Sequence, residues 1–440
     1  MTKDLTKIFD IEVNQPESDQ LNKQADRAQK PVVVPAHLRN VREEYRDLAL
    51  FSCPKYIALC EKTTFTGDDL DKLIRCLNEN GGYTDLVISS ENFIVMKHKK
   101  VIHRLLTRPI SHDEVKRMVE HMYSADVYHH ALEPGQDVDP SYSVDAYDYG
   151  EIPEHGIKSG KEYKYPYRSR VNISSFQTFR GRGVKVTHRS LPPKPPTYDE
   201  LNVSALIRKY ATPRDGLVVV CGETGSGKST LVASIIHALH TNIQDPRFIL
   251  TYEKPIEFVF YHSGGYNPVW QNEIGEFGDF KTFHQGLVNA LRNGPEVIYL
   301  GESREPETFV TLPKIAESGH LGITTMHARS ISNIFTRAAN EVGGNKIGLI
   351  RQMIQYMQLG VYQWLAPTKD GGVAPVQEVL YFSEEIKDAI LSCEDNHLIT
   401  KVDEMVQKHG QSLEQHAKEL LTTDIITPRT FHQITNKQVA

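Results

Sequence analysis

The sequence predicts an α/β protein whose larger part is a parallel sheet covered by helices. After about residue 200, the apolar runs GLVVVCG, FILTYE, EVIYLGE and GITTMHA alternate with segments of helical period. Strands this uniformly apolar are typical of a parallel sheet buried on both faces. The glycine-rich run CGETGSGKST, residues 221–230, ends the first of these strands and opens a helix. The 440 residues leave room for two or three domains at ~100–200 residues each.

The composition excludes several classes of protein. A formal net charge of −6 gives no reason to expect nucleic acid or an anionic membrane as the main partner. The five cysteines are an odd number and form no C-x-x-C pair, which argues against zinc and against a disulfide framework. The N-terminus lacks the apolar core of a secretory signal, and no apolar run approaches the ~18 residues of a membrane-spanning helix. We therefore expect a cytosolic protein without zinc.

The N-terminal half is predicted to hold a flexible arm and a small α/β domain. Residues 1–45 are polar, with mixed charge and few aromatic side chains, as in a flexible arm. Over 46–190, a helical segment, a Gly-Gly break and two strands come first. Ser111 and Glu114 then form the capping box of an amphipathic helix.

Two irregular segments divide the chain. Residues 134–166 are rich in Gly, Pro, Asp and Tyr without helical period, which predicts a long loop or hairpin insertion. The proline-rich linker 191–199 is expected to separate the N-terminal domain from the strand–loop–helix domain of 200–382. Residues 383–440 have the pattern of short amphipathic helices, including EEIKDAIL and SLEQHAKELL.

The glycine-rich run has the sequence context of a phosphate-binding loop, since a buried strand precedes it and a helix begins at Lys228. Glycines let backbone N–H groups converge on phosphate oxygens, and the helix N-terminus adds its positive dipole end. Lys228 is expected to reach the β- and γ-phosphates, and the Ser229 hydroxyl to ligate Mg²⁺. The alternative is a chance glycine turn with a surface lysine. The predicted nucleotide-binding residues are Gly222, Glu223, Thr224, Gly225, Ser226, Gly227, Lys228, Ser229 and Thr230.

Carboxylates follow two other predicted strands. Glu302 comes directly after VIYL, where it could accept a proton from the attacking water and orient it in line, so we expect it to be the catalytic base. Glu253 ends FILTYE and suits a carboxylate that holds Mg²⁺ through water, whereas Glu257 could equally be a surface charge. The alternative for Glu302 is a solvated acidic residue at a strand end.

Two histidines flank a further strand, in GHLGITTMHA. His320 and His327 are seven residues apart and lack a third ligand nearby, which makes a metal site improbable. We expect them to sense the γ-phosphate through hydrogen bonds, with ordinary structural histidines as the alternative.

Together these segments resemble the secretion and pilus ATPases of type II and type IV systems. They read GETGSGKST, TYEKPIE, LRNGPEVIYLGESREPET and SGHLGITTMHA, in the family's order and at similar spacing, and the resemblance covers roughly residues 80–430. It is closest to the retraction-type motors and the type IVB secretion and conjugation motors of the DotB and TraJ group, because the four-cysteine zinc module of other members is missing. Lys254 stands where the family usually has Asp, so only the roles of Glu253 and Glu257 carry over.

The resemblance implies a RecA-like P-loop NTPase domain with a smaller PAS-like α/β N-terminal domain, and ATP and Mg²⁺ as ligands. It implies a homo-oligomeric ring, usually a hexamer, that drives a secretion or pilus system through platform proteins of the inner membrane. The protein would then be cytoplasmic and peripherally associated with that membrane. Nucleic acid would not be required.

A basic stretch leaves a rival function open. Residues 155–194 hold ten Lys or Arg against one acidic residue, with tyrosines interleaved, which also suits a nucleic-acid surface and hence a RecA-like translocase or helicase. The resemblance instead implies that Arg170, Arg180 and Arg189 reach the γ-phosphate in their own or a neighbouring subunit, a role that suits the bidentate, permanently charged guanidinium. A solvated basic face without a partner is the third possibility.

Overall fold

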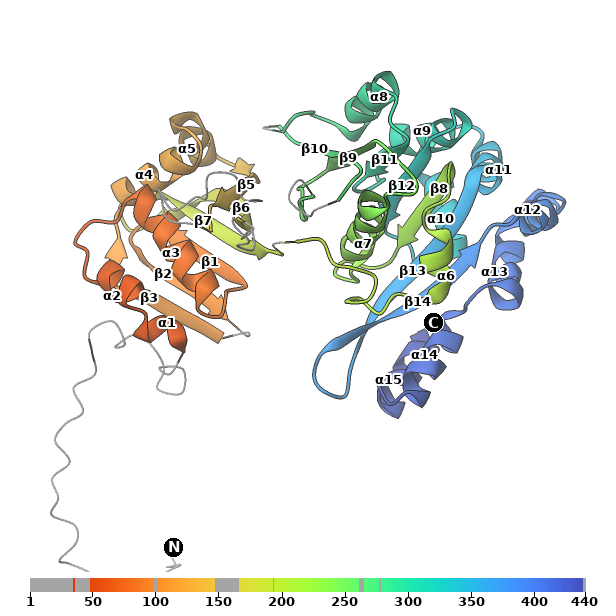
Figure 1. Ribbon diagram of the computed structural model, residues 1–440. Coiled ribbons are helices and arrows are strands. Elements are labelled where there is room, and N and C mark those ends of the chain that lie inside the picture. Colours follow the sequence, from red (N-terminus) through yellow and green to blue (C-terminus); the bar gives the residue numbers. More distant parts are fainter. Residues whose placement is uncertain are drawn as a thin grey trace, which may run out of the picture.

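The computed structural model describes residues 35, 48–98, 101–146, 166–192, 194–260, 265–276 and 278–437 (Figure 1). The arm predicted for 1–45 lies almost entirely outside these residues, as does the greater part of the insertion predicted for 134–166. The beginning of that insertion forms two short strands, β4 (Asp137–Val138) and β5 (Ser141–Val144). The domain boundaries drawn from the sequence remain a prediction.

The N-terminal part is built on an antiparallel sheet in the order β3-β2-β1-β7-β6-β4, with β5 also paired to β6. Its long strands are β1 (Asp85–Ser89), β2 (Asn92–His98), β3 (Val101–Ile110), β6 (Tyr167–Thr178) and β7 (Gly181–Leu191). Its helices are α1 (Ala49–Ser52), α2 (Pro54–Cys60), α3 (Gly67–Glu79), α4 (His112–Met122) and α5 (Ala125–Leu132). Leucine, isoleucine and valine side chains from these helices and strands form one buried core.

Side-chain caps define where two of these helices begin. The Ser111 hydroxyl accepts from the Glu114 backbone N–H at 3.3 Å, and the Glu114 carboxylate accepts from the Ser111 N–H at 2.8 Å, which confirms the capping box predicted for α4. Thr66 and Asp69 make the same reciprocal pair at the start of α3. Each box satisfies backbone donors that the first helical turn leaves without partners.

The C-terminal part contains a seven-stranded sheet in the order β10-β9-β11-β12-β8-β13-β14. The strands are β8 (Gly216–Cys221), β9 (Ile249–Glu253), β10 (Val269–Glu273), β11 (Val297–Leu300), β12 (Leu321–Met326), β13 (Met357–Pro367) and β14 (Val373–Tyr381). All neighbouring pairs are parallel except β13 with β14. The predicted parallel sheet is thus confirmed, and it carries an antiparallel edge hairpin that the sequence pattern did not indicate.

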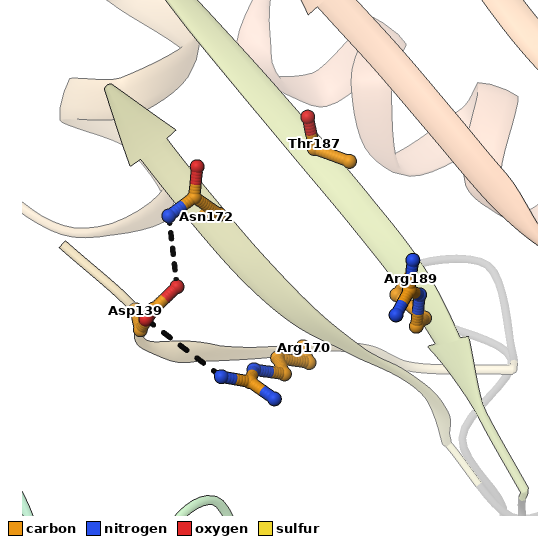
Figure 2. A pocket seen from close by; sticks show the side chains of 5 residues that line it. All are labelled: Asp139, Arg170, Asn172, Thr187 and Arg189. Atoms are coloured by element: carbon orange, nitrogen blue, oxygen red, sulfur yellow. Dashed lines mark hydrogen bonds and ion pairs between the residues drawn. The ribbon is translucent and has the colours of Figure 1, made fainter. Parts of the chain in front are cut away.

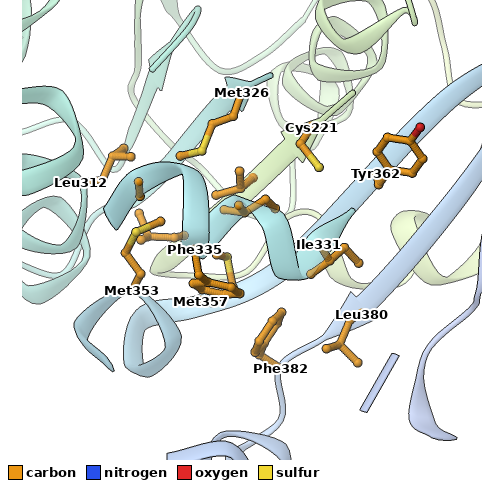
Figure 3. Packing of buried hydrophobic residues seen from close by; sticks show 14 of the residues in the cluster. Cys221, Leu312, Met326, Ile331, Phe335, Met353, Met357, Tyr362, Leu380 and Phe382 are labelled. Carbon is orange, nitrogen blue, oxygen red and sulfur yellow. The ribbon is translucent and has the colours of Figure 1, made fainter. Parts of the chain in front are cut away.

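Helices cover both faces of this sheet, as the uniformly apolar strands predicted. Along β8, Leu217 and Val219 belong to the hydrophobic core of one face, while Val218 and Val220 belong to the core of the other. Figure 3 shows part of the first core, where Phe335 of α10 lies among residues of β12, β13 and β14. A sheet packed on both sides is rigid, so the ends of its strands hold fixed positions.

The helices around the sheet complete the chain. They are α6 (Ala205–Tyr210), α7 (Lys228–Thr241), α8 (Phe283–Asn293), α9 (Pro306–Glu317), α10 (Ile331–Glu341), α11 (Lys346–Tyr356), α12 (Glu384–Leu391), α13 (Leu398–His409), α14 (Leu413–Thr422) and α15 (Pro428–Lys437). EEIKDAIL and SLEQHAKELL form α12 and α14, as predicted. Among the described residues, no helix is long and apolar enough to cross a membrane.

Candidate active site

One edge of the large sheet gathers most of the residues singled out in the sequence. Because β8, β9, β11 and β12 are mutually parallel, their carboxyl ends lie at the same edge, the usual ligand-binding edge of an α/β sheet. The glycine-rich loop follows β8, Glu253 ends β9, Glu302 follows β11, and His327 follows β12. Four segments that are far apart in sequence therefore meet here.

The glycine-rich loop has the conformation of a phosphate cradle. Gly225 and Gly227 have φ values of 78° and 79°, which side chains disfavour, and Gly227 is the left-handed N-cap of α7. The Lys228 ammonium is buried and donates to the backbone carbonyls of Gly222 at 2.9 Å and Glu223 at 2.8 Å. The lysine thus closes the loop on itself, and a bound phosphate would compete for the same ammonium protons.

The pKa of Lys228 also depends on the acidic groups at the same edge of the sheet. Burial lowers the pKa of Lys228, while the negative charges of Glu302 and Glu257 act in the opposite direction. Of the other predicted loop residues, Ser226 is buried, while Glu223, Thr224 and Gly225 are exposed and Ser229 and Thr230 are partly exposed. The exposed loop face is the side open to a ligand.

The Glu302 carboxylate at the end of β11 has two side-chain partners, an arginine and a histidine. It lies 3.3 Å from Nε2 of His327 and 2.7 Å from the Arg304 guanidinium. Gly301 permits this position, because a Cβ there would come within 3.2 Å of the Glu253 Cα. Arg304 was not foreseen, although it stands two residues after Glu302 in the sequence.

Hydroxyl groups join the ends of β11 and β12. The Thr325 hydroxyl donates to the Gly301 carbonyl at 2.5 Å, and the Ser303 and Thr324 hydroxyls hydrogen-bond each other at 2.8 Å. Since these contacts flank Glu302 on both sides, the backbone that carries the carboxylate is fixed before any ligand arrives.

The two glutamates after β9 have different surroundings from those predicted. The Glu253 carboxylate is buried, accepts from the Thr251 hydroxyl at 2.6 Å and from Gln271 at 3.1 Å, and burial raises its pKa to about 7. Glu257 instead lies near Ser229, whose hydroxyl lowers the pKa of the Glu257 carboxylate, and the charge of Glu257 raises the pKa of Lys228. Glu257 is therefore no isolated surface charge, and the geometry favours Glu257 over Glu253 as the carboxylate beside Ser229.

Oxygen groups at this edge match the preferences of Mg²⁺, which is typically held by one or two protein oxygen ligands together with waters and substrate phosphates. Ser229 and Glu257 supply a hydroxyl and a carboxylate that already face each other. Burial raises the pKa of Glu257, and the nearby Arg170 charge is the largest effect that opposes this rise.

The paired role expected for the two histidines is wrong for His320. The His320 carbonyl accepts from the Gly216 N–H at the beginning of β8, and its ring hydrogen-bonds the Ser318 hydroxyl at 2.9 Å. His320 thus lies at the edge of the sheet opposite the phosphate loop, since β12 separates it from His327 by about 20 Å at ~3.3 Å per residue. Only His327 reaches the candidate site.

The three predicted arginines lie on the hairpin of β6 and β7, where Arg170 and Arg189 are register partners. Arg170 lies 3.7 Å from the Asp139 carboxylate, and Arg189 lies 2.9 Å from Asp85. Five residues line a cleft with a volume of about 250 Å³: Asp139, Arg170, Asn172, Thr187 and Arg189 (Figure 2). The charge of Arg170 lowers the pKa of Glu257, so this end of the hairpin faces the phosphate-loop edge.

Arg180 occupies the other end of the same hairpin. It lies in the turn between β6 and β7, is 79% exposed, and pairs with Glu91 at 3.3 Å. Ten residues of strand separate it from Arg170, which is about 33 Å at ~3.3 Å per residue. The structure therefore does not bring Arg180 to the same place as Arg170 and Arg189.

A fourth arginine, which the sequence analysis did not single out, joins the two parts of the chain. Arg168 is buried and donates to the backbone carbonyls of Ile256 at 3.0 Å and Glu257 at 3.2 Å. Nearby, the Ser141 hydroxyl donates to the Glu273 carboxylate at 3.1 Å. Only the R-x-R spacing at the start of β6 could have drawn attention to Arg168, since these two hydrogen bonds go to main-chain atoms.

The chain is similar to known proteins along most of its length. The family model described as "Type II/IV secretion system protein" matches residues 197–431. The type IV pilus retraction ATPase PilT of Pseudomonas aeruginosa is 31% identical over 238 residues, which are 54% of this chain and 67% of that relative.

Solved structures extend the similarity to the N-terminal part. The ATPase DotB of Legionella pneumophila has a TM-score of 0.69 and 28% identity, covering 86% of this chain and 98% of that one. The pilus retraction motor PilT with bound ADP has a TM-score of 0.67 and 26% identity, covering 83% and 96%.

The similarities cover both the fold of the large sheet and the phosphate loop. The large sheet shares the RecA-like fold of the DotB and PilT ATPases. The family match spans the phosphate loop, both carboxylate strands and the C-terminal helices, more than half of the chain. The chain therefore belongs to the type II/IV secretion system protein family of ATPases, and its fold is similar to that of DotB.

Proposed function

We propose that this protein is a ring-forming motor that hydrolyses ATP with Mg²⁺ and powers a type IVB or conjugative secretion system or the retraction of a type IV pilus. The main support for the proposal is that Lys228, Glu302 and Glu257 lie together at one edge of the sheet. There the negative charges of both carboxylates raise the pKa of Lys228. A phosphate loop explains the lysine alone, whereas a hydrolase also needs a group that activates water.

The residues divide the work as follows. The loop N–H groups and Lys228 bind the β- and γ-phosphates, while Ser229 and Glu257 hold Mg²⁺, which neutralises charge on the phosphate oxygens when bound. Glu302 accepts the proton of the attacking water, and His327 holds the Glu302 carboxylate from the side of β12. The related PilT structure contains ADP, which supports an adenine nucleotide as the ligand.

The separation of the arginines supports a ring. Arg170 and Arg189 are near the phosphate-loop edge of their own subunit, whereas Arg180 is at the far end of the hairpin. If Arg180 acts on a γ-phosphate, that nucleotide belongs to a neighbouring subunit. A hexamer with platform proteins of the inner membrane is the assembly we propose, by similarity to the pilus retraction ATPase and to DotB.

The rival function, a nucleic-acid translocase, is less well supported. A surface that follows a phosphate backbone needs cationic side chains free to contact it. Within the described part of the basic stretch, six of the seven cationic side chains have a carboxylate or carbonyl partner, Lys185 being the exception: Arg168, Arg170, Arg180, Arg182, Arg189 and Lys194. Stimulation of ATP hydrolysis by single-stranded nucleic acid would support the translocase function instead.

Mixing two inactive variants tests the shared site. Arg180→Ala leaves the phosphate loop and Glu302 intact, while Glu302→Gln leaves the arginines intact, so each homo-oligomer is expected to be nearly inactive. An arginine supplied by a neighbour can contribute ~10³–10⁵ to kcat in related chemistry. Mixed rings contain interfaces with an intact Arg180 and an intact Glu302, so ATPase activity should partly return.

Two controls make the result decisive. Co-purification through different tags must first demonstrate mixed rings, and Arg182→Ala serves as a neighbouring arginine that donates to a carbonyl of its own subunit. Full activity of the Arg180→Ala protein by itself would mean that Arg180 is a solvated surface residue with no part in hydrolysis. No recovery in proven mixed rings would contradict a contribution in trans.

A further inference from the structure

A buried set of glutamines packs against the phosphate loop. The Gln363 amide, on β13, donates to the Ser226 backbone carbonyl at 2.7 Å. A Cβ at Gly222 would come within 2.4 Å of the Gln363 carbonyl oxygen, and one at Gly227 within 3.0 Å of the Gln363 Nε2. Both glycines that bound the loop are therefore packed against one residue that is only 4% exposed.

A second glutamine fixes the orientation of the first. Gln377 is the register partner of Gln363 on β14, is fully buried, and donates through Nε2 to the Gln363 Oε1 at 2.8 Å. Because the Ser226 backbone carbonyl can only accept, Gln363 must turn its NH₂ toward the loop and its oxygen toward Gln377. Gln377 must in turn direct its own oxygen away, and this oxygen accepts from the Ser204 backbone N–H at 3.3 Å.

The same glutamine is attached to the C-terminal helices. The Gln377 backbone N–H donates to Nδ1 of His416 on α14 at 2.9 Å, and its carbonyl accepts from Gln411 at 2.9 Å. Gln411 also accepts from the Ser204 hydroxyl at 3.0 Å, which closes the network. All donors in the side-chain series point in one direction, from Ser204 to Ser226, so the network has a single satisfied arrangement.

We propose that Gln363 and Gln377 are positioning residues, which make the conformation of the phosphate loop depend on the position of the C-terminal helices. The inference rests on the proposed function in that it takes the loop to bind nucleotide. Holding the Ser226 carbonyl orients the adjoining peptide groups of the loop, whose N–H groups would face phosphate. A shift of α14 relative to β14 would then change the conformation of the loop, and a bound nucleotide would change the position or mobility of α14.

The test replaces single amides by groups of similar shape. Gln377→Met removes the donor to Gln363 and leaves the Ser204 backbone N–H without its acceptor, while Gln363→Met removes the donor to the Ser226 carbonyl and leaves the bond between Ser204 and Gln377 in place. Each is expected to weaken binding of a fluorescent ADP analogue about tenfold, the effect of one buried polar group left unsatisfied. Since the loop is used equally in the ground and transition states, KM for ATP should rise while kcat at saturation stays within about twofold.

Gln358→Met is the matched control. Gln358 lies on the same strand β13, but beside Gly216 at the opposite edge of the sheet from the loop. Thermal unfolding of all variants separates lost stability from lost binding. A Gln377 variant that is less stable and yet binds nucleotide like the parent would overturn the proposal. Absence of nucleotide binding in the parent protein would instead overturn the proposed function.

Hydrogen exchange measures the connection to the C-terminal helices. In the parent, ADP is expected to slow amide exchange in α14 as well as in the phosphate loop. In Gln363→Met, ADP at saturating concentration should still protect the loop while α14 loses its response. If ADP leaves exchange in α14 unchanged in the parent, the loop is not coupled to these helices.

Discussion

The phosphate-loop edge and the arginine hairpin face the same candidate nucleotide site, yet they are positioned in different ways. Glu302 and Lys228 lie at the ends of parallel strands within one doubly covered sheet, and short hydrogen bonds fix the backbone around them. Arg170 and Arg189 lie on a separate antiparallel sheet, which meets the phosphate-loop side through Arg168 and through Ser141 with Glu273.

This difference indicates which part is preassembled and which part is adjustable. The carboxylates keep their positions as long as the sheet is folded, because β9, β11 and β12 are hydrogen-bonded neighbours. The arginines keep theirs only while the contact between the two parts is maintained. Inter-domain contacts of limited extent are the usual place for relative motion, and a motor requires such motion.

The largest effect is expected at the preassembled edge, with Glu302→Gln. The amide keeps the size of the side chain but cannot accept a proton from water, so kcat should fall ~10²–10⁴-fold. Nucleotide affinity, measured by fluorescence titration, should be retained. Hydrolysis within a few-fold of the parent rate would remove Glu302 from the role of base.

A smaller loss is expected from Lys228→Ala. The ammonium donates to the Gly222 and Glu223 carbonyls without ligand and should move to phosphate when nucleotide binds. Hydrogen bonds from charged groups imply a loss of about 10- to 100-fold in affinity, which calorimetric titration with ADP would measure. An unchanged dissociation constant would mean that the loop does not bind phosphate through this residue.

Arg168→Ala tests the adjustable contact and should have a milder effect. Losing the two bonds to the Ile256 and Glu257 carbonyls should loosen the segment that carries Glu257, with about a tenfold drop in kcat/KM. Arg182→Ala is the control, since Arg182 donates to Leu132 within the N-terminal part. Equal rates for the two variants would show that the contact has no role in turnover.

Glu378→Gln should affect stability rather than catalysis. Glu378 is buried on β14, accepts from the Ile331 N–H that opens α10, and burial raises its pKa from 4.5 to about 7, with a contribution from the charge of Asp403. The folded state therefore holds a proton that the unfolded state releases, so this stabilisation is complete below about pH 4.5 and is lost as the pH rises to about 7.

The variant isolates this effect because the amide still accepts from Ile331 but cannot ionise. Its free energy of unfolding should exceed that of the parent increasingly between about pH 5 and pH 7, at about 1.4 kcal/mol per pH unit, and by on the order of 3 kcal/mol at pH 8. Chemical denaturation at several pH values measures the difference, and the parent's Glu253 contributes equally to both proteins. A difference independent of pH would show that Glu378 is ionised in the fold.

Local pattern was sufficient for the elements of the site. The apolar runs predicted the parallel strands, the glycine spacing predicted the loop before α7, and Ser111 with Glu114 predicted the start of α4. These features depend on residues within a few positions of one another. Secondary structure and capping follow mainly from such neighbours, which is why a sequence can reveal them.

The partners of the site were decided by tertiary structure. The sequence could not show that Glu257 rather than Glu253 lies beside Ser229, since Glu253 ends β9 and Glu257 follows only four residues later. It could not bring Arg168 to the carbonyls after β9. The antiparallel edge strand β14 brings Gln377 to Gln363 and, through it, to the phosphate loop. Each of these contacts joins segments distant in the chain, and its geometry depends on strand order and register, which exist only once the sheets have formed.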